Sequence, residues 1–114
     1  MEPSIAVLTL TVQATAPIAP ARFVSLPGGV PTAGAPSYGV ARSAAAAGQL
    51  VAVDVLGTAP VEAGAAIPAG SAVQTDALGR AIPLDTGEKL GRLAPGHSGA
   101  TAAGQRVEVM LLPN

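Results

Sequence analysis

Ala102-Ala103-Gly104-Gln105-Arg106-Val107-Glu108-Val109 is the stretch that decides the fold, because the chain contains its pattern three times. A nearly identical stretch, Ala46-Ala47-Gly48-Gln49-Leu50-Val51-Ala52-Val53, lies upstream, and a looser copy, Pro68-Ala69-Gly70-Ser71-Ala72-Val73-Gln74-Thr75, lies between the two. Each copy closes a small-residue turn with Gly, which readily adopts the positive φ of a tight turn, and continues with the alternation typical of a strand. The chain therefore repeats one turn-to-strand unit.

The segments before the first and last copies also match loosely. Gly39-Val40-Ala41-Arg42 precedes the first copy, and Gly91-Arg92-Leu93 precedes the last. This similarity predicts two related hairpin units that pack together. It is a prediction about the scaffold and says almost nothing about an activity.

Short apolar segments separated by Gly, Pro or Asp turns run through the whole chain, and this spacing is typical of a small all-β barrel or sandwich. We expect strands at residues 5–13, 22–26, 38–42, 50–56, 59–62, 72–75, 81–84, 89–93 and 106–112. Residues 27–36 are rich in Pro and Gly and predict a loop that no regular ladder could accommodate. The expected organisation is an N-terminal strand or extended arm at residues 1–20 and a single β-barrel-like domain at residues 21–114.

The N-terminal segment has one apolar side. Residues 5–13 alternate, so that Leu8, Leu10 and Val12 fall on one face of a strand, and Pro17 follows as a breaker. Such a segment can pair with the edge of a neighbouring chain, or it can be the first strand of the barrel itself. The residues leave both alternatives open.

Composition limits the kinds of partner that this chain can have. It has 114 residues, a formal net charge of −1, no Cys and only 11% charged residues. Without Cys there are no disulfides and no thiolate metal sites, and six scattered Lys and Arg residues form no basic stripe for a phosphate backbone. No run approaches the ~18 apolar residues of a membrane span. We therefore expect neither a nucleic-acid nor a membrane partner.

The hydrophobic core must consist mainly of small and medium-sized aliphatic side chains. Phe23 and Tyr38 are the only aromatic residues, so Val, Leu, Ile and many Ala residues build the interior, and each buries modest area. The scarcity of charge would give an isolated monomer an unusually apolar surface. We infer that neighbours cover much of this surface; an Ala-rich, thermally rugged domain is the alternative interpretation.

We expect no catalytic residue, no cofactor and no metal site, and so no enzyme. Gly96-His97-Ser98-Gly99-Ala100 resembles a nucleophile elbow, but Ala100 stands where the elbow needs Gly. Residues 61–73 have the Gly spacing of lipoyl and biotinyl carrier domains, yet the only Lys, Lys89, lies outside them. The carboxylates are dispersed, which leaves only a weak calcium site open in the turns at Asp76 or Asp85.

An ordered series of segments covers most of the chain. They are Arg22-Phe23-Val24, Tyr38-Gly39-Val40-Ala41-Arg42, residues 46–53, residues 57–64, residues 67–76, Gly79-Arg80-Ala81, and Gly91-Arg92-Leu93 leading to Gln105-Arg106-Val107-Glu108-Val109. In this order the segments resemble small bacteriophage capsid decoration proteins, also called cement or head-stabilisation proteins. The resemblance implies a β-barrel-like domain on the outer face of the capsid in the virion, made in the host cytoplasm. It implies the major capsid protein as partner, a homotrimer, stabilised contacts between capsid subunits and no cofactor.

Candidate contacts with the capsid or with a second subunit are apolar. They are Ile5, Val7, Leu8, Leu10, Val12, Val30 and Pro31. A β-rich carbohydrate-binding or adhesion module is the alternative function, against which the scarcity of aromatic rings counts, because sugars stack on such rings. A small β-domain cut from an enzyme is a further alternative.

Overall fold

The computed structural model describes residues 5–25, 28–94 and 99–111, and within these ranges the chain is all-β, as predicted. Its strands are β1 (Ile5–Gln13), β2 (Phe23–Ser25), β3 (Ser37–Ala41), β4 (Leu50–Glu62), β5 (Ile67–Pro68), β6 (Ala72–Thr75), β7 (Ala81–Pro83), β8 (Gly91–Leu93), β9 (Gly99–Ala100) and β10 (Arg106–Leu111). Turns containing Gly, Pro or Asp separate them, so the strands end where the turn residues of the sequence predict.

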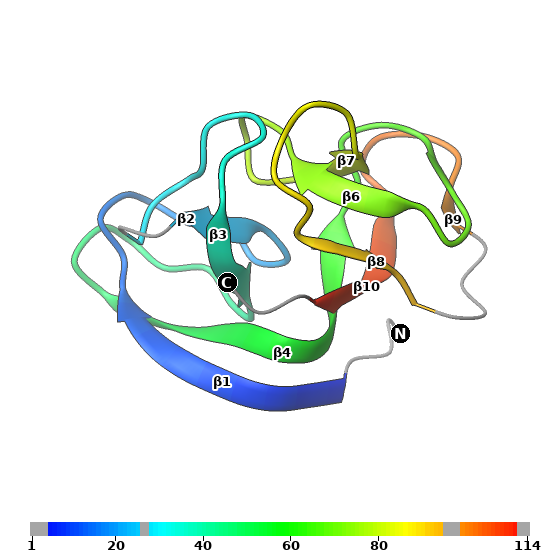
Figure 1. Cartoon of the computed structure of the whole chain (residues 1–114). Helices are drawn as coiled ribbons and strands as arrows, with labels where there is room; N and C mark the ends of the chain where they lie inside the picture. The colour runs from blue at the N-terminus through cyan, green and yellow to red at the C-terminus, as the bar shows by residue number, and fades with distance from the viewer. Residues whose placement is uncertain (1–4, 26–27, 95–98, 112–114) are drawn as a thin grey trace.

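Strand β4 differs from the prediction, because the two expected strands at residues 50–56 and 59–62 are one continuous strand. At their junction Gly57 has a φ of 96°, which few residues other than Gly adopt. The pairing of β1 with β4 shifts register at this point. Gly57 therefore bends the strand without ending it, and Figure 1 shows β4 running beside β1 and then turning up into the barrel.

The sheet follows the order β2-β3-β4-β10-β8-β6-β7 and curls into a nearly closed barrel. Ala63, just after β4, forms a parallel bridge with Ala81 of β7. The Phe23 N–H of β2 donates to the Gly79 carbonyl in the β6–β7 turn at 2.7 Å. These two contacts join the ends of the path, so the barrel has few exposed edges. Its interior is filled by a cluster that includes Phe23, Val61, Val73, Leu93, Val107 and Val109.

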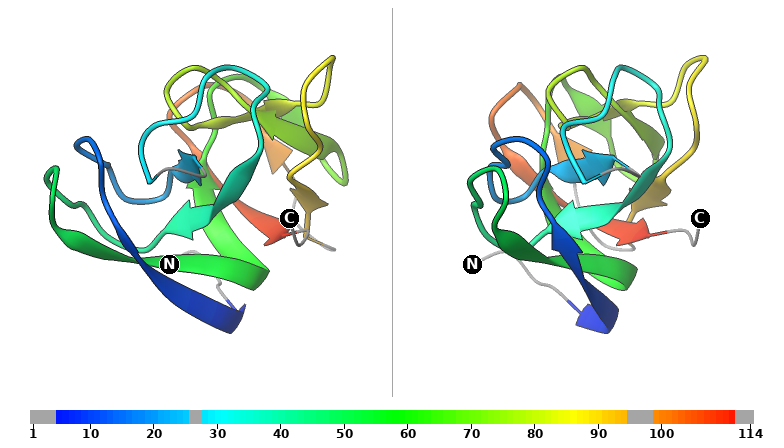
Figure 2. Two further views of the ribbon diagram at one scale, coloured as in Figure 1. Left: turned by 60° about the vertical axis from the view of Figure 1, so that its left-hand side comes forward. Right: turned by 90° about the vertical axis from the view of Figure 1, so that its left-hand side faces the viewer.

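A second, smaller core lies outside the barrel, between the β2–β3 hairpin and the long β1–β4 ribbon (Figure 2). Adjacent residues of β2 serve different cores: Phe23 points into the barrel, and Val24 points into the second core. In β3, Val40 and Ala41 divide in the same way. The β2–β3 hairpin therefore lies between the two cores and is buried on both faces. The second core consists of Ala14, Ile18, Val24, Ala41, Ala45, Val51 and Val53.

The chain contains two structural repeats of one topology. In the first repeat the strands lie in the order β1-β4-β3-β2, and in the second they lie in the order β4-β10-β8-β6. Strand β4 is the last strand of the first repeat in the chain and the first strand of the second. The hairpins predicted from the sequence are present at equivalent registers, since Ala41 pairs with Val53 and Leu93 pairs with Val109.

The repeated Gly-Gln turns hold equivalent strands in the same way. In the first repeat, Ala14 N–H donates to the Gln49 carbonyl and Gly48 N–H donates to the Ala14 carbonyl. In the second, Ala63, Gln105 and Gly104 form the same reciprocal pair of hydrogen bonds. The glycines at positions 48, 70 and 104 have φ values of 87°, 74° and 93°, which confirms the conformation predicted for all three copies.

Candidate interaction surface

The β1–β4 ribbon carries an apolar face that the second core covers only in part. Cross-strand partners lie on the same face of a sheet, and Leu10 and Val12 of β1 pair with Val53 and Val51 of β4. The two β4 residues are buried, and Val12 packs against the same core. Further along β1, however, Leu10 is 43% exposed and Leu8 is 44% exposed. The apolar face therefore continues beyond the core that it helps to build.

The outer edge of β1 has unpaired backbone groups. Ala14, one residue past β1, directs its N–H and C=O toward the β4 side, and this direction alternates along a strand. Leu10 and Val12 therefore face β4, whereas the N–H and C=O of Thr9 and Thr11 point outward. Within the described part of the chain, no segment pairs with the outer side of these two threonines.

Strand β1 lacks the usual protection of an edge strand. Natural edges are commonly blunted by charged side chains, by Pro or by short length. Residues 5–13 include neither a charge nor a Pro, and β1 has 9 residues. Of the known protective features, β1 has only irregular pairing, since its register with β4 shifts on both sides of Leu8. Such an edge is suited to accept another strand.

The other predicted contact residues lie in different environments. Ile5 and Val7 belong to the β1 backbone, and the structure does not describe their side chains. Val30 is exposed in the loop before β3, whereas Pro31 is among the fully buried side chains. This loop reaches β1, because the Thr15 N–H donates to the Gly28 carbonyl at 3.1 Å. Leu8, Leu10 and Val30 thus offer exposed apolar surface, and Pro31 does not.

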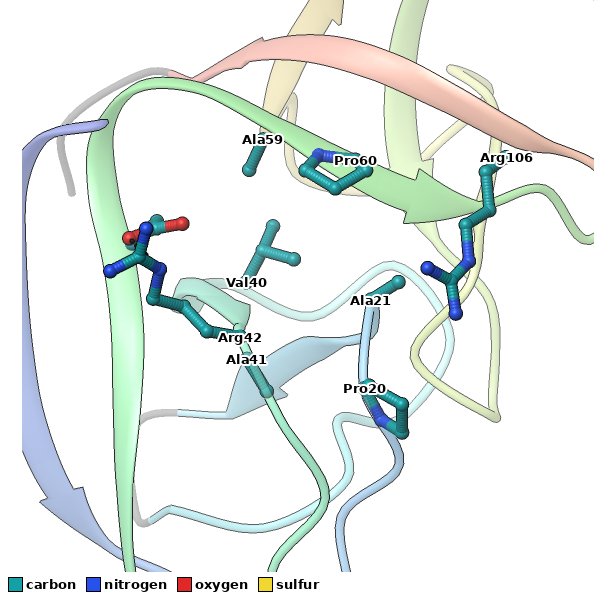
Figure 3. Close-up of a pocket in the computed structure, with 9 residues that line it drawn as sticks. Pro20, Ala21, Val40, Ala41, Arg42, Ala59, Pro60 and Arg106 are labelled. Atoms are coloured by element: carbon teal, nitrogen blue, oxygen red, sulfur yellow. Dashed lines mark ion pairs between the residues drawn. The ribbon is translucent and has the colours of Figure 1, made fainter. Parts of the chain in front are cut away.

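A small pocket lies in the bend of β4 (Figure 3). At its wall the carboxylate of Asp54 is 2% exposed, accepts a hydrogen bond from Thr9 Oγ1 at 2.8 Å and faces Arg42 Nε at 3.4 Å. Arg106 enters from the opposite side, and Pro60 forms part of the lining. The cavity holds about 100 Å³, well below the ~300–1,000 Å³ of most small-molecule sites. Through Asp54 these contacts hold β1, β4 and the end of β3 together, and the cavity offers little room for a substrate.

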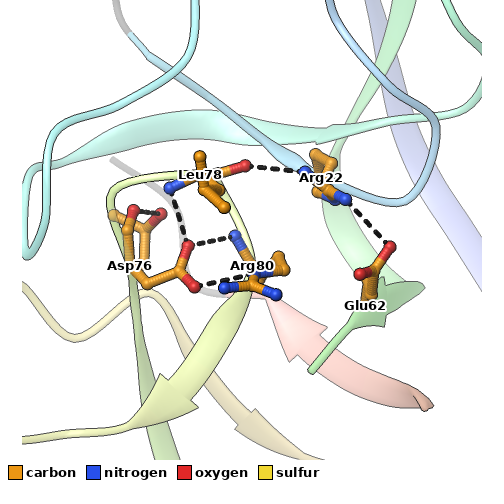
Figure 4. A network of polar contacts seen from close by, with 6 residues as sticks. Arg22, Glu62, Asp76, Leu78 and Arg80 are labelled. Carbon is orange, nitrogen blue, oxygen red and sulfur yellow. Dashed lines mark hydrogen bonds and ion pairs between the residues drawn. The ribbon is translucent and has the colours of Figure 1, made fainter. Parts of the chain in front are cut away.

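A charged network ties the two repeats together (Figure 4). Arg22, next to β2, pairs with Glu62 at the end of β4 at 3.0 Å and donates to the Leu78 carbonyl at 3.0 Å. In the same turn, Asp76 accepts hydrogen bonds from the backbone N–H groups of Leu78 and Arg80 and pairs with the Arg80 side chain. The Asp76 carboxylate therefore caps its own turn, which is a structural use of the group.

The side chains that could bind a metal ion are dispersed over the described residues. Within residues 5–25, 28–94 and 99–111, no three Asp, Glu or His residues form a group that could hold a metal ion. The elbow-like segment around His97 and Ser98 lies mostly outside the described residues. These same ranges include no helix with the length and apolarity needed to cross a membrane.

Sequence reasoning missed two features of this surface. It did not predict the burial of Asp54 beside Thr9 and Arg42. It also predicted that β1 can pair with another edge, but it did not specify that the backbone of Thr9 and Thr11 points outward. A carboxylate within an apolar strand was the available signal for Asp54. The exposed edge depends on strand order, for which the sequence has no local signal.

Comparison with known proteins agrees with this architecture. The family model described as phage cement protein matches residues 1–111. No curated protein matches the chain. Among solved structures, the N base of the head fiber protein gp8.5 of bacteriophage phi29 is similar, with a TM-score of 0.72 and 21% identity over 92% of this chain and 93% of that one. The structural likeness shows a shared fold, and the family match shows that this chain belongs to the phage cement proteins, structural proteins of the bacteriophage head.

Proposed function

We propose that this protein binds the outer surface of the phage head as a non-enzymatic cement and stabilises contacts between major capsid subunits, as a trimer. The observation that supports the proposal most is the exposed apolar face at Leu8 and Leu10, on a chain that belongs to the cement family. A monomer exposing this face and an unpaired edge is better suited to a shell surface than to free solution.

Energetics favour a docking role for this face. Burying a whole Leu side chain stabilises a complex by roughly 1.5–3 kcal/mol. Leu8 and Leu10 are each a little under half exposed, so covering both contributes about 2 kcal/mol before the costs of association. That corresponds to about a 30-fold change in affinity. Many copies on one head would add such contributions over the whole shell.

Binding to capsids that lack the protein tests the proposal. The purified chain is mixed with such capsids, pelleted and quantified, and the heat resistance of the capsids is compared with and without it. We expect saturable occupancy and more resistant capsids. Replacing both Leu8 and Leu10 by Ser should weaken binding about 30-fold, while Leu78→Ser, at an exposed residue of the β6–β7 turn, should not. Wild-type protein that stays in the supernatant would refute the proposal.

The trimer is tested separately by the native mass of the protein in solution and on the capsid. Three copies per binding position support it, and single copies at every position would refute that part alone. The alternative of a carbohydrate-binding module has little support from the aromatic residues, because Phe23 is buried and Tyr38, which is 37% exposed, is a single ring.

A further inference from the structure

The two repeats identify which positions of β1 correspond to positions of β4. Ala14 and Ala63 make the same reciprocal hydrogen bonds with their Gly-Gln turns. Counting back from these alanines, Leu10 corresponds to Ala59, Thr11 to Pro60 and Val12 to Val61. The registers agree, because Val12 pairs with Val51 as Val61 pairs with Val107.

In the second repeat, the chain itself covers the end of the outer edge of the first strand, at Glu62 and just beyond it. The Glu62 N–H donates to the Ala21 carbonyl at 2.8 Å, and the Gly64 N–H donates to the Ala81 carbonyl at 2.8 Å. Ala59 and Val61 on this strand are both 0% exposed. The edge and the apolar face are therefore covered together.

In the first repeat, only the end of the corresponding edge is covered. Thr15 N–H donates to the Gly28 carbonyl, in the position of the bond from Gly64 to Ala81. Beyond this point the described residues provide no segment that corresponds to Ala21. The backbone of Thr9 and Thr11 is left open, and Leu10 is 43% exposed where its counterpart is fully buried.

We propose that an extended segment of a capsid subunit adds to the outer edge of β1 as a further strand. Its backbone hydrogen-bonds with the N–H and C=O groups of Thr9 and Thr11, and the body of that subunit covers Leu8 and Leu10. This inference rests on the proposed function and specifies its contact. The segment is uncharged where it meets β1, because an unpaired charge against this edge would lose its solvation.

A capsid subunit fits the outer edge of β1 better than a second copy of this chain does. Antiparallel pairing of β1 with another β1 would extend the sheet and would place two more exposed leucines beside Leu8 and Leu10. The enlarged apolar face would still lack a cover, and large exposed patches of this kind are rare on isolated soluble proteins. A capsid surface can supply both a strand that pairs with β1 and apolar surface that covers Leu8 and Leu10.

Thr11→Pro tests the inference, with Thr11→Ala as its matched control. Proline removes the outward N–H of residue 11, and Pro60 shows that a strand paired in this way accommodates proline at the corresponding position. Alanine removes the side chain but keeps the N–H. We expect Thr11→Pro to lower capsid affinity about 10-fold or more, because a buried hydrogen bond is lost, while Thr11→Ala binds like wild type.

Melting temperatures of the free variants show whether both fold, and hydrogen exchange of the wild type covers the case in which Thr11→Pro does not. On the capsid, the amides of Thr9 and Thr11 should exchange more slowly, while those of Leu10 and Val12, which face β4, change little. Equal binding of both variants, or unchanged exchange at Thr9 and Thr11, would overturn the inference and leave the cement role intact.

Two further outcomes are distinguishable. If Thr11→Pro dissociates an oligomer in solution but binds capsids normally, the occupant is a second copy, and the inference is overturned. If the wild type itself does not bind capsids, the proposed function fails and this inference fails with it.

Discussion

The repeated Gly-Gln turn predicts equal penalties at two places far apart in the chain. An added Cβ at Gly48 or Gly104 would meet no atom within 4 Å, so Gly→Ala causes no steric clash at either position. Their φ values are 87° and 93°, however, in the region that a side chain disfavours by roughly 1–2 kcal/mol. Each substitution should therefore lower the free energy of unfolding by about that amount, through backbone conformation alone.

The loss of stability can be expressed as a melting temperature. For 114 residues the entropy of unfolding is about 0.24 kcal/mol/K, so 1 kcal/mol lowers the midpoint by about 4 °C. We expect Gly48→Ala and Gly104→Ala each to melt about 4–8 °C below wild type. The double variant should show the sum, because the turns belong to different repeats.

Asparagine at the same positions gives the matched control. Asn tolerates positive φ better than Ala, so Gly48→Asn and Gly104→Asn should recover a substantial part of the loss. Calorimetry or circular dichroism melting of the free protein measures all five variants. Wild-type stability of either Ala variant, or Asn variants no better than Ala variants, would refute the assignment of the cost to φ.

Three more substitutions test contacts between the strands. At Gly39 and Gly91, an added Cβ would fall on the carbonyl oxygens of Asp54 and Met110, so Gly→Ala at either position should destabilise by more than about 3 kcal/mol, measured by urea unfolding; a loss as small as at Gly48 would contradict the close approach of the strands. Asp54→Ala removes the acceptor of Thr9 and the ionic partner of Arg42 and should cost about 1–3 kcal/mol, which thermal melting would detect; an unchanged midpoint would mean that the pocket does not pin β1.

The sequence predicted local structure well, because local structure here follows from alternation and from turn residues. The Val positions of residues 50–56 and 106–112 marked their strands, and Gly in each repeated phrase marked the turn before a strand. Gly57 misled the prediction, because Gly with positive φ serves equally in a turn that ends a strand and in a bulge that bends one. Only the pairing of β1 across this point shows that β4 continues.

Strand order was beyond local reasoning, since it depends on contacts between distant segments. Nothing in residues 5–13 specifies that they pair with residues 50–58, which come more than 35 positions later. The burial of Asp54 follows from that register, which sets Thr9 opposite it. Pro31 shows the same limit, because a Pro in a loop rich in Pro and Gly gives no local sign of being fully buried.

The two repeats share β4, and this explains why the first strand of the second repeat is covered on its outer side and the first strand of the first repeat is not. The end of β4 lies between β10 and the contacts to Ala21 and Ala81, so the N–H groups of Glu62 and Gly64 are bonded within the chain. Within the described sheet, strand β1 has β4 on one side only. The barrel can therefore hold the fold together with a core of small aliphatic residues, while β1 keeps backbone and apolar surface for a partner. Substitutions in the barrel core should thus reduce stability, and substitutions on the outer side of β1 should reduce binding, with little overlap between the two effects.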